Sequence, residues 1–161
     1  MKKAIITIIA SMLTIGAMAQ VNAVGIPFGM GKYEARQLLR SKYGEPAYST
    51  INMIMYANFR LDGVSYETAS FFFDDDMKFT SASFSRHDQK TAEALAADAK
   101  AVADILEQQY LVVNLYEHGV NQSYTQNGQT IMTIYRAAPR QLINGRLAYM
   151  VNIIGHLSDD G

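Results

Sequence analysis

The strongest constraint in this sequence is a segment of alternating residues that ends in a tight turn. Its apolar residues occupy every second position: Ile51, Met53, Met55, Ala57, Phe59 and Leu61. Alternation of this length predicts a β-strand with one face on a hydrophobic core. Asp62-Gly63 follows, a pair typical of a two-residue hairpin. The turn predicts a return strand over 64–73, with Leu61 opposite Val64 and Phe59 opposite Tyr66.

The segment before this hairpin predicts a capped helix over about 32–43. Gly31 lies at its N-cap, and Glu34 in the first turn favours the positive end of the helix dipole. The predicted buried face consists of Ala35, Leu38, Leu39 and Tyr43. Gly44 is suited to end the helix, and Pro46 prevents its continuation.

A second helix is predicted over about 88–110, with Ser85 and Asp88 as candidate capping residues. Apolar residues recur along it at helical spacing: Leu95, Ala99, Val102, Leu106 and Tyr110. Strands are predicted after it over 111–116, 130–136 and 146–154. Asn127-Gly128 and Asn144-Gly145 predict two further hairpin turns, and Pro139 limits the middle strand to an edge or an early end.

The element order is therefore a helix and three strands, twice, once a strand over 78–84 is included in the first half. Short links and hairpin turns require antiparallel pairing. The sequence predicts an α+β fold, a twisted antiparallel sheet of about six strands with two helices packed on one face.

The first 19 residues predict a cleaved signal peptide. Lys2 and Lys3 precede an apolar run over 4–16, and Ala17-Met18-Ala19 fits a signal peptidase site. The run is shorter than the ~20 residues of a membrane span. We expect cleavage after Ala19 and a periplasmic or secreted mature chain. That chain, residues 20–161, is expected to form a single domain of two half-repeats, about 26–85 and 86–157.

Composition argues against several classes of function. The sequence contains no cysteine, which excludes disulfides, thiol nucleophiles, cysteine-bound metals and a cysteine-linked lipid anchor. With Lys2 and Lys3 removed, 12 of the 14 basic residues remain against 15 acidic ones, so the net charge is −3. Such a chain lacks the basic surface that binds nucleic acid or anionic lipid. We expect neither partner and no membrane span, and the sequence leaves the oligomeric state open.

Four local features of the first half form a recognisable set: Phe28-Gly29-Met30, Tyr43-Gly44-Glu45-Pro46, the strand containing Tyr56, and Phe71-Phe72-Phe73-Asp74-Asp75. Together they resemble small exported proteins of Bacteroidetes-type bacteria and, more distantly, the BLIP-like and BamE/SmpA-like modules. Those modules share a G-M-x-x-x-x-V-x-x-x-L-G-x-P helix signature and an α-β-β-β plan, sometimes duplicated. The resemblance implies this fold and export. It implies no catalytic residue, because the modules are mostly binding or assembly parts.

Residues with catalytic or metal-binding potential form no known motif. Asp74-Asp75-Asp76 lacks the spacing of an EF-hand and is predicted to be an acidic surface turn. His87, His118 and His156 are dispersed, without an H-E-x-x-H pair. There is also no G-x-S-x-G elbow and no phosphate-binding glycine loop. We expect no catalytic residue, no cofactor and no metal.

Aromatic residues on the predicted strands favour a binding surface. With both helices on one face of the sheet, Ile54, Tyr56 and Phe71 are predicted to lie on the opposite, open face. Exposed residues of this kind mark binding sites, although cross-strand aromatic pairs also stabilise sheets. The leading hypothesis is a non-enzymatic module that holds a protein or peptide on the open sheet face. The alternatives are an envelope structural or assembly component and a small periplasmic hydrolase.

Overall fold

The computed structural model describes residues 22–86, 89–115, 121–126, 129–141 and 147–154, with side chains through Leu111. Helix α1 spans Lys32–Tyr43 and helix α2 spans Ala92–Leu106. The strands are β1 (Tyr48–Ser49), β2 (Met53–Leu61), β3 (Val64–Phe73), β4 (Phe79–Ser85), β5 (Leu111–Leu115), β6 (Asn121–Gln126), β7 (Gln129–Gln141) and β8 (Leu147–Ile154). The expected signal peptide and its cleavage position lie outside the described residues.

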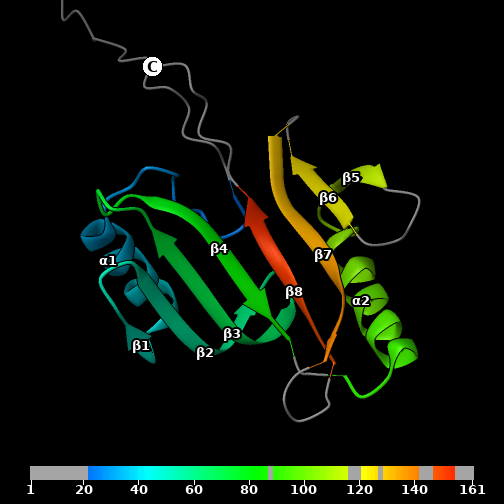
Figure 1. Ribbon diagram of the computed structural model, residues 1–161. Coiled ribbons are helices and arrows are strands. Elements are labelled where there is room, and N and C mark those ends of the chain that lie inside the picture. The colour runs from blue at the N-terminus through cyan, green and yellow to red at the C-terminus, as the bar shows by residue number, and fades with distance from the viewer. Residues whose placement is uncertain (1–21, 87–88, 116–120, 127–128, 142–146, 155–161) are drawn as a thin grey trace, which may run out of the picture.

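All described strands join one antiparallel sheet in the order β1-β2-β3-β4-β8-β7-β6-β5. Each helix is followed by strands that pair with their chain neighbours, and β4 and β8 pair at the centre (Figure 1). The prediction of an α+β fold with an antiparallel sheet and two helices is confirmed. The prediction of about six strands is wrong, because the two-residue β1 and the polar β6 add two more.

The β2–β3 hairpin has the predicted register. Leu61 pairs with Val64, and Phe59 pairs with Tyr66. Asp62 and Gly63 take φ angles of 51° and 84°, the left-handed conformation that a type I′ turn requires at both central positions. Local turn chemistry is therefore sufficient to position these two strands.

The buried face of β2 changes side in the middle of the strand. Ile54 and Tyr56 are buried in its first half, whereas Phe59 and Leu61 are buried in its second half. Between them Asn58 has a φ of 52°, and the described ladder contains no Asn58–Glu67 pair. The register is the same on both sides of this position, with Ala57 opposite Thr68 and Phe59 opposite Tyr66, so this is not a β-bulge. Strand β3 changes its buried side at the same level, at Glu67 and Thr68, so the two strands rotate together. The prediction that Met53, Met55 and Ala57 face the core is therefore wrong.

The core lies between the sheet and both helices. One continuous cluster joins Ala35 and Leu39 of α1, Leu95 and Leu106 of α2, and the buried strand residues. Phe71 lies at its centre, in contact with four other aromatic rings: Tyr56, Phe59, Phe79 and Phe84. Because residues of both helices belong to one cluster with the buried side chains of the strands, both helices pack on one face of the sheet.

Helix α1 has the predicted boundaries, and Gly44 at its C-cap has a φ of 84°. Its buried face is narrower than predicted, because Leu38 is 44% exposed. Helix α2 is shorter than the predicted 88–110. Thr91 is its N-cap, and the Thr91 hydroxyl accepts a hydrogen bond from Ala94 N at 3.1 Å.

Strand β7 differs from its prediction. It continues to Gln141 and lies between β6 and β8, so Pro139 is neither at an edge nor at an early end. The pairing of β7 with β8 is irregular between Tyr135 and Arg140, which brackets the proline. A proline removes one ladder donor, and a break in register accommodates it inside a sheet.

Candidate functional site

The side of the sheet opposite the helices forms the candidate site. In the first half of the sheet, ten exposed or partly exposed residues on this side form one continuous area: Tyr48, Met53, Met55, Ala57, Thr68, Ser70, Phe72, Ser81, Ser83 and Ser85. We call these ten residues the open face. These ten residues include no charged side chain and no imidazole. Beyond them, Arg60 and Ser65, which pair nearer the β2–β3 turn, are exposed on the same side.

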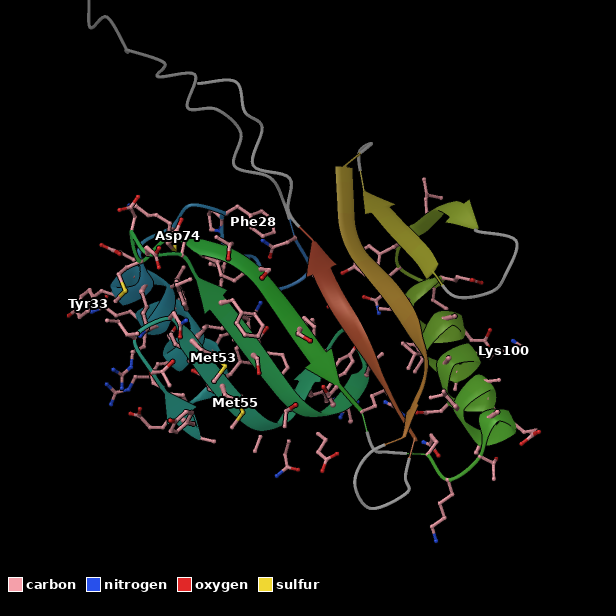
Figure 2. All side chains as sticks on the ribbon, in the orientation of Figure 1. Phe28, Tyr33, Met53, Met55, Asp74 and Lys100 are labelled. Carbon is pink, nitrogen blue, oxygen red and sulfur yellow. The ribbon has the colours of Figure 1, made fainter. Side chains whose placement is uncertain are left out.

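The edge of the open face carries an apolar patch. Tyr48 on β1 pairs with Met55 on β2, and Met53 pairs with Phe72 on β3. Tyr48 is 54% exposed and Phe72 is 36% exposed. We call Tyr48, Met53, Met55 and Phe72 the methionine patch. Figure 2 shows both thioether groups on the same side of β2.

The centre of the open face is lined by hydroxyl groups. Register places Ser70 opposite Ser83, and Thr68 opposite Ser85. The same rows continue along the backbone into β8, where Ser83 pairs with Asn152 and Ser85 pairs with Met150. Short hydroxyl side chains leave the neighbouring methionine patch accessible from solvent.

The three residues predicted to line an open face lie on the other side of the sheet. Ile54 and Phe71 are 0% exposed, and Tyr56 is 3% exposed. Tyr56 donates a hydrogen bond from its hydroxyl to Gly44 O at 3.1 Å, and its ring contacts Tyr43 of α1. Burial is the main cause that raises the pKa of Tyr56. The placement of these three residues on the open face is therefore wrong.

Lys32 holds the loop beside the methionine patch in place. Its ammonium donates hydrogen bonds to Thr50 O and, at 3.0 Å, to Ile51 O. It also lies 5.9 Å from the centre of the Phe73 ring. Burial, followed by the neighbouring Arg36 charge, lowers the pKa of Lys32. The start of α1 is thereby connected to the β1–β2 loop, which positions Tyr48 next to Met55.

The remaining candidates offer no catalytic arrangement. Asp74 accepts a hydrogen bond from Lys78 N at 2.8 Å, which closes the acidic turn. The structure places no group of three or more His, Cys, Asp or Glu residues together within its described part. His87, His118 and His156 lie outside the described residues. Within the described ranges, neither helix has the length and apolarity of a membrane span.

A shallow pocket of about 280 Å³ lies between the N-terminal segment and α1. Its lining consists of Val24, Gly25, Ile26, Leu38, Leu39, Ser41, Lys42 and Tyr43. Lys42 is its one charged residue, and the Lys42 ammonium donates to Val24 O at 3.4 Å. The lining contains no carboxylate or imidazole, so the pocket provides no acid–base pair.

No protein-family model matches this chain, and no curated protein or solved structure matches it either. The candidate site therefore depends on geometry alone. That geometry is a hydroxyl-lined area of the sheet face with an apolar patch at one edge.

Sequence reasoning missed the methionine patch because it placed Met53 and Met55 in the core. One signal pointed to the correct face. Ser81, Ser83 and Ser85 alternate with Ala82 and Phe84, so the serines mark the solvent side of β4. Ser83 pairs with Ser70 on β3, and Ser70 pairs with Met55 on β2, so Met55 lies on the solvent side as well.

Proposed function

We propose that this protein is a non-enzymatic binding module that holds a protein or peptide on the open face. One observation carries the proposal: large apolar side chains of the methionine patch remain exposed beside a fully packed aromatic core. Aromatic residues and methionine are enriched at the centres of protein interfaces. Methionine side chains are also flexible enough to fit different ligand shapes.

The hydroxyl rows complement this patch. Serine and threonine offer donors and acceptors to a ligand backbone without the desolvation cost of a charged group. An extended peptide that lies across β2, β3 and β4 would place apolar side chains on the methionine patch and polar groups on the serines. Because the methionine patch and the hydroxyl rows carry no charge, they favour a ligand segment of low net charge.

Two further parts of the proposal concern the origin and location of the chain. We propose an exported location on the basis of the N-terminal sequence pattern. We also propose that the domain arose by duplication of one helix-and-strands unit. The order of elements supports this, because a helix followed by four strands occurs twice and the sheet order is symmetric about the β4–β8 pair.

A peptide selection tests the binding function. A displayed library of random peptides is selected on the immobilised protein, and the affinity of the selected peptides is measured by fluorescence anisotropy. The double variant Tyr48→Ser/Phe72→Ser is expected to weaken binding at least tenfold, about 1.4 kcal/mol. Its free energy of unfolding should remain close to that of the wild type, because both side chains are exposed.

Tyr33 provides a matched control. It is an aromatic residue, 71% exposed, on α1, which packs on the other face of the sheet. The Tyr33→Ser variant should bind the selected peptides as the wild type does. Equal loss of binding in Tyr33→Ser, or full binding by the double variant, would refute the proposal.

A further inference from the structure

Two thioether side chains of the methionine patch lie two positions apart on the same face of β2. These residues, Met53 and Met55, are both partly exposed. Side chains at i and i+2 of a strand project from the same face, with Cα atoms about 6.8 Å apart. Because methionine has three flexible side-chain bonds, both sulfur atoms can reach one ion between them. Figure 2 shows the two side chains next to each other on β2.

Aromatic rings flank this pair on both sides. Phe72 pairs with Met53 and Tyr48 pairs with Met55, so one ring lies directly across the ladder from each thioether. The faces of aromatic rings attract cations within about 6 Å, more strongly where water is excluded. The register thus groups two thioethers and two aromatic rings, without a carboxylate among them.

The chemistry of the donors selects the kind of ion. Hard cations such as Ca²⁺ and Mg²⁺ require several oxygen ligands, typically carboxylates. The open face carries no carboxylate and no imidazole. Soft thioether sulfur prefers soft monovalent ions, and Cu(I) is the ion of this class that proteins commonly bind.

We propose that Met53 and Met55 form a binding site for a soft monovalent cation, Cu(I) or its analogue Ag(I). The two sulfur atoms ligate the ion, and the rings of Phe72 and Tyr48 shield it. Binding is a simple association without electron transfer. The site follows from strand geometry and donor chemistry, so it stands independently of the proposed peptide-binding function.

Silver is the direct probe, since it needs no reductant and resists oxidation. The full chain is titrated with silver nitrate in chloride-free buffer. Native mass spectrometry gives the stoichiometry, and isothermal titration gives the affinity. The protein is also labelled with ¹³C at the methionine methyl groups. We expect one Ag⁺ per chain, with the largest NMR shifts at the methyl groups of Met53 and Met55.

The Met53→Leu/Met55→Leu variant removes both sulfur atoms while keeping the shape and volume of the side chains. Its affinity for Ag⁺ should fall at least tenfold. The matched control is Met30→Leu/Met77→Leu, which alters two partly exposed methionines away from the open face and should bind as the wild type does.

Three results would overturn the site: unchanged affinity in the Met53→Leu/Met55→Leu variant, methyl shifts centred on Met30 or Met77, or no binding by the wild type. The methyl shifts are recorded on the wild-type protein, so the test holds even if the double variant folds poorly. If the Met53→Leu/Met55→Leu variant loses Ag⁺ binding but still binds the selected peptides, the ion site is distinct from the proposed peptide-binding site.

Discussion

Tyr110 shows how single side chains connect the turn that follows α2 to the β2–β3 hairpin. Its hydroxyl donates a 2.6 Å hydrogen bond to Asp62 Oδ2, and Gln109 Nε2 donates to Asp62 O at 3.0 Å. Burial, the hydrogen bond to Asp62 and the charge of Asp62 together raise the pKa of Tyr110. The tyrosine therefore stays protonated in the folded protein at pH values where it ionises in the unfolded chain.

This shift predicts a pH-dependent contribution to stability. A raised pKa stabilises the fold fully below the unfolded value of about 10, and the contribution is lost as pH rises toward the folded value. The wild type should have a larger free energy of unfolding than Tyr110→Phe. The difference should stay constant up to about pH 9 and should shrink as the pH rises above about 10. Urea denaturation from pH 7 to pH 11 measures this difference. A difference that stays constant over the whole range would contradict the assignment.

At the scale of the element, β2 depends on one residue in an unusual conformation. Asn58 has a φ of 52°, and the buried face of the strand changes side at this position. Asparagine and glycine tolerate the left-handed region, whereas a β-branched residue does not. The change of side is what places Met53 and Met55 in solvent while Phe59 remains in the core.

Substitutions at Asn58 test this role. Asn58→Gly should leave the free energy of unfolding nearly unchanged, because glycine adopts the same backbone angles. Asn58→Val should lower it by about 1–2 kcal/mol. Chemical denaturation of the two variants gives the comparison. Equal stabilities would show that the left-handed conformation at this position is not required.

The elements differ in how far the sequence predicts them, for physical reasons. The boundaries of α1 and the register of the β2–β3 hairpin depend on local chemistry at Gly31, Gly44 and Asp62-Gly63, and both were predicted correctly. Strand β6 was missed because its sequence is polar throughout, and only Asn127-Gly128 indicated a partner strand.

The sequence of β2 alone does not predict which of its side chains face the core. Its odd positions are apolar along the whole length, so periodicity assigns one buried face. The structure departs from this at Asn58, whose positive φ the hydrophobic periodicity does not indicate. This single change moved the candidate site from Ile54, Tyr56 and Phe71 to the methionine patch.

On the scale of the whole molecule, the sheet has one covered and one open face. Both helices pack on the covered face, and the eight strands form a single continuous sheet (Figure 1). The open face meets solvent over at least β1 to β4, where its side chains are described. The proposed peptide and metal sites both depend on this division.

Phe71 and Phe72 test the assignment of the covered and open faces most directly, since they are adjacent phenylalanines on opposite faces of β3. Phe71 is 0% exposed and Phe72 is 36% exposed. Phe71→Ala should lower the free energy of unfolding by about 3–5 kcal/mol. Phe72→Ala should lower it by at most about 1 kcal/mol. Equal losses in the two variants, or a larger loss for Phe72→Ala, would contradict the assignment of the open face.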